Sequence, residues 1–413
     1  MQKIGLYVGV IWICVSFSVI AQIESQFSFS EINTSENKHR LTMDSRYYSG
    51  SNTLTNQFMN QAFGGLLSDE IKQNAYKDLT SKNRAGYFFN YGLYYQGKIF
   101  NNSIELLAGV RSSEFFHAQF SKEALMLVLS GNTIFPNQKT TVSPFSYYYS
   151  TYEDIVLGLG NINLTPKSKL YTWLSIRKTS NYQLLNIYNA DIYTSALGDS
   201  IQLYANLKSE NTPMGIKRVH AYSGMGVGVN LQYFYFSNPH RVELSILDIG
   251  MSRLRNLSQY AIQSGLTFTG IDIDDFKDST LAFESFNADS IDGIFGAKRS
   301  LVAKWINHLP FIKVQYSYET NHWYIQTGVM TIFNAHFVPL VYVYPNYKLL
   351  GDRLMVAPAL SYGGYEKFSF GLNLSYEFLQ NFKVTMQNFY LENVFLPKVT
   401  HGQGLQFSII GSF

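Results

Sequence analysis

The densest group of residues that could bind a metal ion is acidic. It consists of Asp272, Asp274, Asp275 and Asp278. Calcium takes about six to eight oxygen ligands, and a segment of this kind can supply several of them. The spacing lacks the glycine and the glutamate that an EF-hand loop needs at its sixth and twelfth positions. A solvated acidic loop is the favoured interpretation, with a weak metal site as the alternative.

A second group could support hydrolysis. His322, His336 and Ser317 lie in neighbouring predicted strands, and a hydrolase needs a hydroxyl nucleophile, a histidine and an orienting polar group within reach. The chain has no Gly-x-Ser-x-Gly nucleophile elbow. Its single cysteine, Cys14, lies in an N-terminal apolar run, so the remainder offers neither a thiolate nor a disulfide. We expect no enzyme and no cofactor.

A third group is basic, and it could line a pore and select anions. Its members are Arg218, Arg241, Arg253 and Arg255, followed by Lys298 and Arg299. Paired charges that merely fill a polar interior are an equal alternative. The net charge of +3 over 413 residues is too small to indicate nucleic-acid binding.

The elements that would position these residues are predicted to be strands. Tyr and Phe each occur 31 times, and charged residues make up 15% of the chain, against about 25% in an average soluble domain. Tyrosines such as Tyr147, Tyr148 and Tyr149 are typical of girdles at a membrane–water boundary. A stacking platform for sugars or nucleic acid is the alternative for these rings.

The last segment has a clear strand pattern. One face carries Leu405, Phe407, Ile409, Gly411 and Phe413. The other face is mostly polar, with Gln406, Ser408 and Ser412, and Ile410 is the exception. A terminal strand that ends in Phe is typical of outer-membrane β-barrels, which face lipid outside and a polar lumen inside. The alternative is an ordinary edge strand of a soluble sheet.

The N-terminus resembles an export signal. A short basic start precedes the apolar run from Ile4 to Ile20, and Ala21-Gln22 follows as a cleavage site. We expect residues 1–21 to be a signal peptide. A membrane anchor is the alternative, because the run approaches the ~18 residues of a span.

The body of the chain, 22–413, is predicted to be one domain. Strand patterns begin near Gly86 and resume strongly at Pro310, separated by turn signals, which predicts an all-β, antiparallel up-and-down transmembrane barrel of about 14 strands. A short helix is expected over Ser121 to Leu129, in the barrel mouth or lumen. Residues 250–308 are expected to be an insertion or plug, with helices near Leu254 to Ile262 and Ala297 to Asn307.

Several stretches resemble an uncharacterised family of outer-membrane barrels found in Bacteroidota. They are Phe120 to Leu127 with Gly131-Asn132, Tyr152-Glu153 with Leu157 to Gly160, Leu266 to Asp272, and Leu309-Pro310. That family is distantly similar to barrels of the fatty-acid-transporter type and to barrel subunits of the type IX secretion machinery. The resemblance implies a fold and a location, and no functional residue.

These observations favour a channel or transporter for small molecules, including hydrophobic ones. The alternative is a non-conducting barrel that acts as a scaffold for a secretion or surface-attachment complex. The expected location is the outer membrane. The expected partners are its lipid and the barrel-assembly machinery, which would read the strand ending in Phe413; the scaffold alternative adds protein partners of a secretion complex. The two functions differ in the lumen, since a channel needs a continuous water path and a scaffold tolerates a lumen filled by large side chains.

Overall fold

A computed structural model describes residues 39–64, 67–99, 104–196, 200–212, 223–268, 299–351, 353–379, 381–388 and 390–413. The expected signal peptide lies outside the described residues. Among those residues, no helix is both long and apolar enough to cross a membrane.

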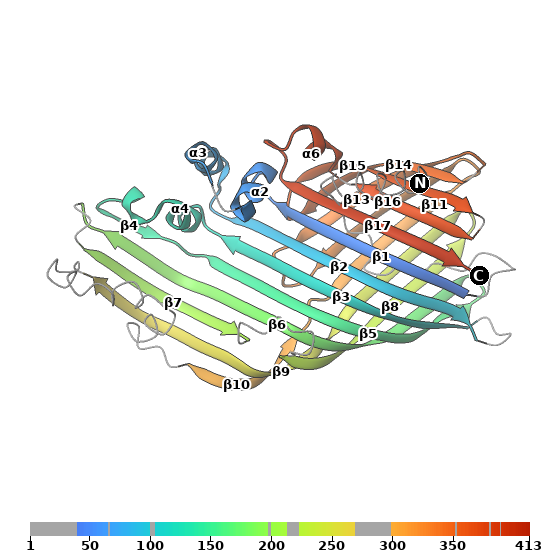
Figure 1. Cartoon of the computed structure of the whole chain (residues 1–413), viewed down its shortest axis with the longest axis horizontal. Helices are drawn as coiled ribbons and strands as arrows, with labels where there is room; N and C mark the ends of the chain where they lie inside the picture. The colour runs from blue at the N-terminus through green and yellow to red at the C-terminus, as the bar shows by residue number, and fades with distance from the viewer. Residues whose placement is uncertain are drawn as a thin grey trace, which may run out of the picture.

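Fourteen antiparallel strand positions form a closed barrel, as the strand patterns predict (Figure 1). The strands are β1 His39–Ser51, β2 Asn83–Lys98, β3 Glu105–Phe120, β5 Phe145–Thr165, β6 Ser168–Thr194, β8 Gly224–Ser237, β9 His240–Phe268, β11 Phe311–Glu319, β12 Trp323–Ile332, β13 Val338–Leu349, β14 Leu354–Gly364, β15 Phe368–Leu379, β16 Phe382–Asn388 and β17 Gly402–Ser412. The barrel closes because β1 pairs with β2 on one side and with β17 on the other.

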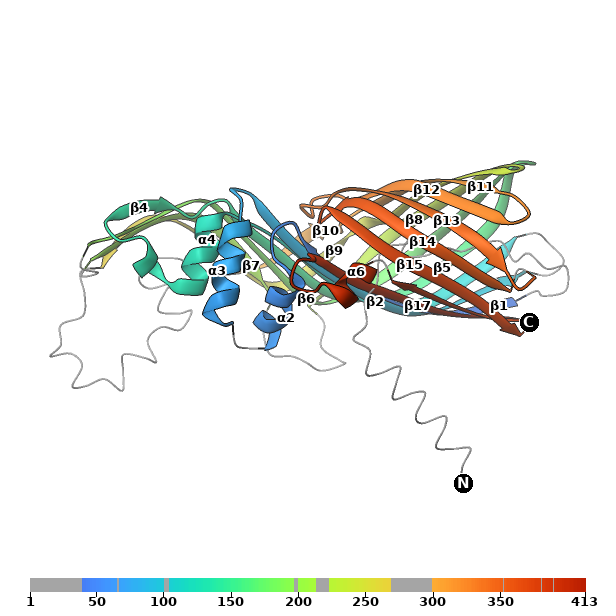
Figure 2. The same ribbon diagram turned by 90° about the horizontal axis from the view of Figure 1, so that it is seen from above.

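One side of the barrel is much taller than the other. β6 and β9 have 27 and 29 residues, whereas β11 and β12 have 9 and 10. Three shorter strands continue the tall side: β4 Gln138–Thr141 beyond β5, β7 Ile201–Asn211 beyond β8, and β10 Ser300–Asn307 beyond β11. Together they form a sheet that projects past the barrel (Figures 1 and 2).

Side-chain alternation separates the two faces of the wall. In β3, Val110 is 54% exposed whereas the next residue, Arg111, is 3% exposed. In the neighbouring strand, Ile155 pairs with Val110 and is equally exposed, while Asp154 is 2% exposed. An apolar outer face and a polar inner face are the pattern of a transmembrane barrel.

Short helices lie at the tall end. They are α2 Asn56–Gly64, α3 Asp69–Asp78 and α4 Lys122–Ser130, and α6 Leu391–Phe395 lies above the short side. The helix predicted after Ser121 is confirmed as α4, and its N-cap hydroxyl accepts a hydrogen bond from the Ala124 amide. Its apolar side packs with Ala118 and Phe120, which share the outer face of β3 with Val110. The helix therefore packs outside the wall, and the expectation of a luminal helix is wrong.

The expected insertion at 250–308 is also different where the structure describes it. β9 continues as a strand to Phe268, and β10 occupies Ser300–Asn307. The two expected helices are therefore wrong. The helix prediction came from apolar residues at positions 254, 257 and 262, whose spacing is close to that of a helix. In the structure the side chains alternate as in a strand: Ser252 and Leu254 are buried, whereas Met251 and Arg253 are exposed.

Candidate functional site

The most developed polar site is a buried cluster of four charges inside the barrel. Arg111 of β3, Asp154 of β5, Arg177 of β6 and Asp248 of β9 have side chains between 0 and 4% exposed. Arg177 donates from Nη2 to Asp248 Oδ1 at 2.6 Å and from Nε to Asp154 Oδ1 at 2.8 Å. Arg111 donates from Nη2 to Asp248 Oδ1 at 2.8 Å and from Nε to Asp154 Oδ2 at 3.0 Å. Each carboxylate is therefore shared by both guanidinium groups.

The strand register brings the four residues together. Arg111 pairs with Asp154 and Asp154 pairs with Arg177, so three of them form one row across β3, β5 and β6. Opposite Arg177 stands Gly226 of β8, which has no side chain to separate Arg177 from β9. The row can therefore reach one strand further, to Asp248.

A local distortion of β9 turns Asp248 toward this row. Asp248 has a left-handed backbone with φ of 58°, next to a register shift between Val229 and Leu231 of β8. The Asp248 amide donates to Asn230 Oδ1 at 2.9 Å, and Asn230 Nδ2 donates to Ser175 Oγ at 2.9 Å. An aspartate tolerates a left-handed backbone better than most residues, and the Asn230 side chain replaces the lost ladder partner.

The charges of the cluster cancel. Two guanidinium groups face two carboxylates, and the Arg177 guanidinium carbon also lies 3.5 Å from the centre of the Tyr152 ring. Buried charges are tolerated only when they are paired and hydrogen-bonded, and this cluster meets both conditions. In this state it fills and neutralises its part of the lumen.

A second buried pair occupies another part of the inner wall. Lys313 Nζ lies 2.6 Å from Glu243 Oε1, and both side chains are 3% exposed. Gln232 and Ser245 donate to the same carboxylate oxygen at 2.9 and 2.8 Å. This lysine charge is therefore also neutralised within the lumen.

The turn between β14 and β15 packs against β1 and β2 at the mouth of the short side. The Tyr48 and Tyr390 hydroxyls both donate to the Glu366 carboxylate, and the Tyr365 amide donates to the Tyr48 oxygen at 3.1 Å. The Tyr365 ring lies directly over Gly86 of β2, where a Cβ atom would be 2.2 Å from it. Burial raises the pKa of Glu366 to about 7, and the two tyrosine hydrogen bonds oppose that rise.

Aromatic side chains line the same mouth. The Tyr48 ring centre lies 5.3 Å from Phe88 and 6.3 Å from Phe337, and Phe337 meets Tyr365 edge to face at 5.2 Å. Phe88 in turn stacks on Phe115 at 6.4 Å. These rings pack into one buried apolar cluster that extends from the turn along the inner side of β1, β2 and β3.

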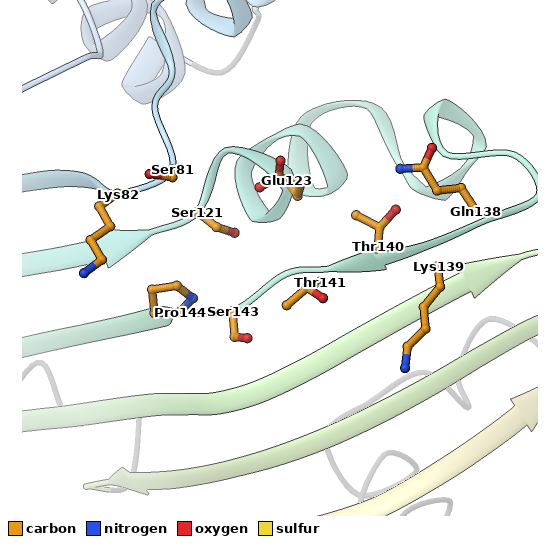
Figure 3. A pocket seen from close by; sticks show the side chains of 10 residues that line it. All are labelled: Ser81, Lys82, Ser121, Glu123, Gln138, Lys139, Thr140, Thr141, Ser143 and Pro144. Carbon is orange, nitrogen blue, oxygen red and sulfur yellow. The ribbon is translucent and has the colours of Figure 1, made fainter.

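A separate polar pocket of about 470 Å³ lies on the projecting sheet (Figure 3). Ser121 and Glu123 at the start of α4 form one side, and Thr140 and Thr141 of the β4 segment form another. Lys139 extends away from the helix and pairs with Asp191 at 3.1 Å. The pocket lies on the outer side of the wall, so it is not part of the lumen.

The residues predicted from the sequence are dispersed. Arg241 lies on the inner face, opposite Ser317, and its guanidinium carbon is 4.5 Å from the centre of the Phe234 ring. Arg253 and Arg255 are exposed on the outer face with Met251, so they do not line the lumen. Arg218 and the four aspartates at 272, 274, 275 and 278 lie outside the described residues, as does Lys298. In the part of the chain that the structure describes, no three acidic, histidine or cysteine side chains form a metal-binding group.

The three residues considered for hydrolysis are not brought together. His322 and His336 lie beyond opposite ends of β12, whose 10 residues separate them by about 30 Å at strand rise. Ser317 is 2% exposed in the lumen, whereas His336 is exposed and contacts Ser146 Oγ at 3.0 Å. The geometry does not assemble a nucleophile and a base from this set.

The sequence analysis did not select the four residues of the luminal cluster, although their positions in the strands could have indicated them. Asp154 and Arg177 are charged residues at inward positions of otherwise alternating strands. The partners are 23 to 137 residues apart, so only the register identifies them.

Solved structures of other barrel proteins align with most of the chain, but with low scores. No family model matches the chain, and no curated protein matches it. The structure of the P. putida toluene transporter TodX aligns with a TM-score of 0.45 at 9% identity, over 92% of this chain and 91% of that one. A variant of the Rh. blastica porin aligns with a TM-score of 0.27 at 8% identity, over 91% of this chain and 100% of that one. Likenesses at this level carry no argument about function.

Proposed function

We propose that the protein is an outer-membrane barrel that transports small, largely apolar molecules through a lumen that is closed at rest. The apolar outer face supports a position in a bilayer, since Val110 and Ile155 on the outside are each 54% exposed. The export signal expected at the N-terminus and the terminal strand ending in Phe413 agree with this location and with insertion by the barrel-assembly machinery.

The aromatic cluster at the mouth carries the proposal. Tyr48, Phe88, Phe115 and Phe337 form a buried apolar cluster inside the barrel, next to the β14–β15 turn. Small-molecule sites are mostly apolar with a few placed polar groups, and Glu366 is such a group here. Beyond the rings, the neutral cluster around Arg177 and Asp248 fills the lumen. Such a lumen favours transient opening over a permanent water path.

The test uses the refolded mature protein in liposomes and in a planar bilayer. We expect low ion conductance for the unaltered protein, together with faster entry of a small aromatic probe such as toluene than in protein-free liposomes. Arg177→Gln should raise conductance, because it removes one of the two cations that hold the cluster. Arg353→Gln, an exposed arginine in the β13–β14 turn, is the matched control. Entry of the probe at the protein-free rate in correctly inserted samples would refute transport.

The second candidate is a non-conducting scaffold, and the projecting sheet favours it. β6, β7 and β9 continue beyond the barrel, and α4 packs on their outer side through Val142, Ala190 and Ile192. A partner protein could bind this surface without any role in transport. Inserted protein that shows neither probe entry nor conductance, in the native form and in Arg177→Gln, would favour the scaffold.

A further inference from the structure

The outer wall of the barrel is hollowed by a groove of about 710 Å³ that crosses the strands from β1 to β8. Its apolar lining includes Met43, Leu93, Val110, Ile155 and Ile176, which are between 45 and 54% exposed. Each of these five residues pairs in register with the next, so they form one continuous row. An apolar outer face is expected of any membrane barrel, so the feature that distinguishes this place is the hollow in the wall.

A second row, one step toward the projecting sheet, is charged. Glu153 pairs in register with Lys178, Lys178 with Met225, Met225 with Arg253, and Arg253 with Trp305. Glu153, Lys178 and Met225 line the groove directly. The apolar row is therefore bordered on one side by a row in which cations outnumber anions.

Part of this positive charge is not neutralised. Lys178 Nζ contacts Glu153 Oε2 at 2.9 Å, which accounts for the one carboxylate in the row. Arg253 and Arg255 are exposed, and among the described residues neither has an ion-pair partner. Trp305 beside Arg253 is 56% exposed on the same face, and exposed tryptophan is typical of the membrane–water boundary.

We propose that this groove is a binding site for an anionic lipid of the surrounding bilayer. An acyl chain lies along the row from Met43 to Ile176, and the lipid phosphate contacts Arg253 and Arg255. The inference rests on the proposed membrane location, and it is independent of transport. A neutral partner helix would cover the apolar row but leave both arginines unpaired at the edge of a bilayer, whereas a phosphate accepts bidentate hydrogen bonds from them.

The test measures lipid retention by native mass spectrometry of the refolded full-length mature protein. Phosphatidylglycerol and phosphatidylcholine with identical acyl chains are the two probes. We expect the unaltered protein to retain phosphatidylglycerol about thirtyfold better, since each of the two arginines near an anionic lipid contributes about 1 kcal/mol. The double variant Arg253→Gln/Arg255→Gln should bring the preference to about twofold or less. Arg353→Gln, at the opposite end of the barrel, should leave it unchanged.

A second variant tests the groove without altering charge. Ser112 lies on the outer face and lines the groove, so Ser112→Trp fills it and should weaken retention of both lipids. Equal retention of the two lipids by the unaltered protein would overturn the proposal. So would a preference that survives in the arginine double variant, and so would unchanged retention of both lipids in Ser112→Trp. Failure of the unaltered protein to insert into liposomes would instead refute the membrane location, and failure of probe entry alone would refute only transport.

Discussion

Arg177 reaches Asp248 at 2.6 Å although the strand β8 lies between β6 and β9, which carry them. The contact exists because Gly226 stands opposite Arg177 and presents no side chain to the lumen. Asp248 completes it with a left-handed backbone that Asn230 stabilises. A glycine, a distorted aspartate and an asparagine thus allow four charges from four strands to neutralise each other.

Arg177→Gln tests the stability of this cluster. The substitution leaves Asp154 and Asp248 buried with one remaining guanidinium, Arg111. Removal of one partner from a buried ion pair costs about 3–5 kcal/mol, so we expect the free energy of unfolding to fall by about that amount. This free energy is measured by urea unfolding in detergent micelles. The folded fraction is monitored on a gel of unheated samples, where folded and unfolded barrel migrate as separate bands.

The neighbouring residue supplies the control. Lys178 forms an ion pair with Glu153 on the outer side, where the lysine is 26% and the glutamate 50% exposed. Lys178→Gln should cost about 1 kcal/mol or less, since exposed ion pairs contribute little. Similar losses for Arg177→Gln and Lys178→Gln would show that the luminal cluster has no special stabilising role.

Gly226→Val tests the space over β8. A Cβ atom at this position would lie 2.2 Å from Ser252 Oγ and 2.3 Å from the Met251 carbonyl oxygen. Since the second neighbour is backbone, the two strands must separate, and we expect a loss of about 2–3 kcal/mol in unfolding free energy. Gly265→Val in the projecting part of β9 is the control, because its nearest neighbour is Leu203 O at 3.7 Å. A loss no larger than that of the control would contradict the close approach.

The sequence predicted the barrel because its signals are local. Alternation within each strand and polar turns between strands were sufficient to predict a barrel of about fourteen strands, and the structure has fourteen. The N-cap at Ser121 was likewise read correctly from a few adjacent residues. The location of α4 depended on the face of β3 that carries Ala118 and Phe120, which no local signal specifies.

The candidate site could not be predicted in the same way. Arg253 and Arg255 were selected by charge alone, and their strand parity places both on the outer face. The luminal cluster required the registers of β3, β5, β6 and β9 together with a distortion at Asp248. Arg111 and Asp248 are 137 residues apart in the sequence, and a single sequence does not show which residues of such distant strands lie next to each other.

Ser121→Ala tests the cap of α4. Ser121 Oγ accepts a hydrogen bond from the Ala124 amide at 3.1 Å, and loss of a serine cap costs about 1 kcal/mol. Because the helix lies outside the barrel wall, we expect faster hydrogen–deuterium exchange in residues 122–130 and no change in barrel unfolding. Lys122→Ala removes a side chain in the first turn and keeps the cap, so its exchange rates should match the unaltered protein. Equal exchange in both variants would refute the capping role.

Glu366 predicts a pH dependence at the mouth. Burial raises its pKa to about 7 from 4.5, so the folded state favours the protonated carboxyl. The stabilisation from this protonation is fully present below pH 4.5 and is lost as the pH rises through about 7. The full difference is about 3 kcal/mol, since one pKa unit corresponds to about 1.4 kcal/mol.

Glu366→Gln isolates this contribution. Glutamine stays neutral, so the variant should lose stability less than the native protein when unfolding is measured at pH 5 and at pH 8. Burial also raises the pKa of Glu392 to about 6, so some pH dependence persists in the variant. Glu319→Gln, whose carboxylate is 58% exposed and paired with Lys348, should retain the native pH profile. If Glu366→Gln also retains that profile, the Glu366 carboxyl does not titrate in this range.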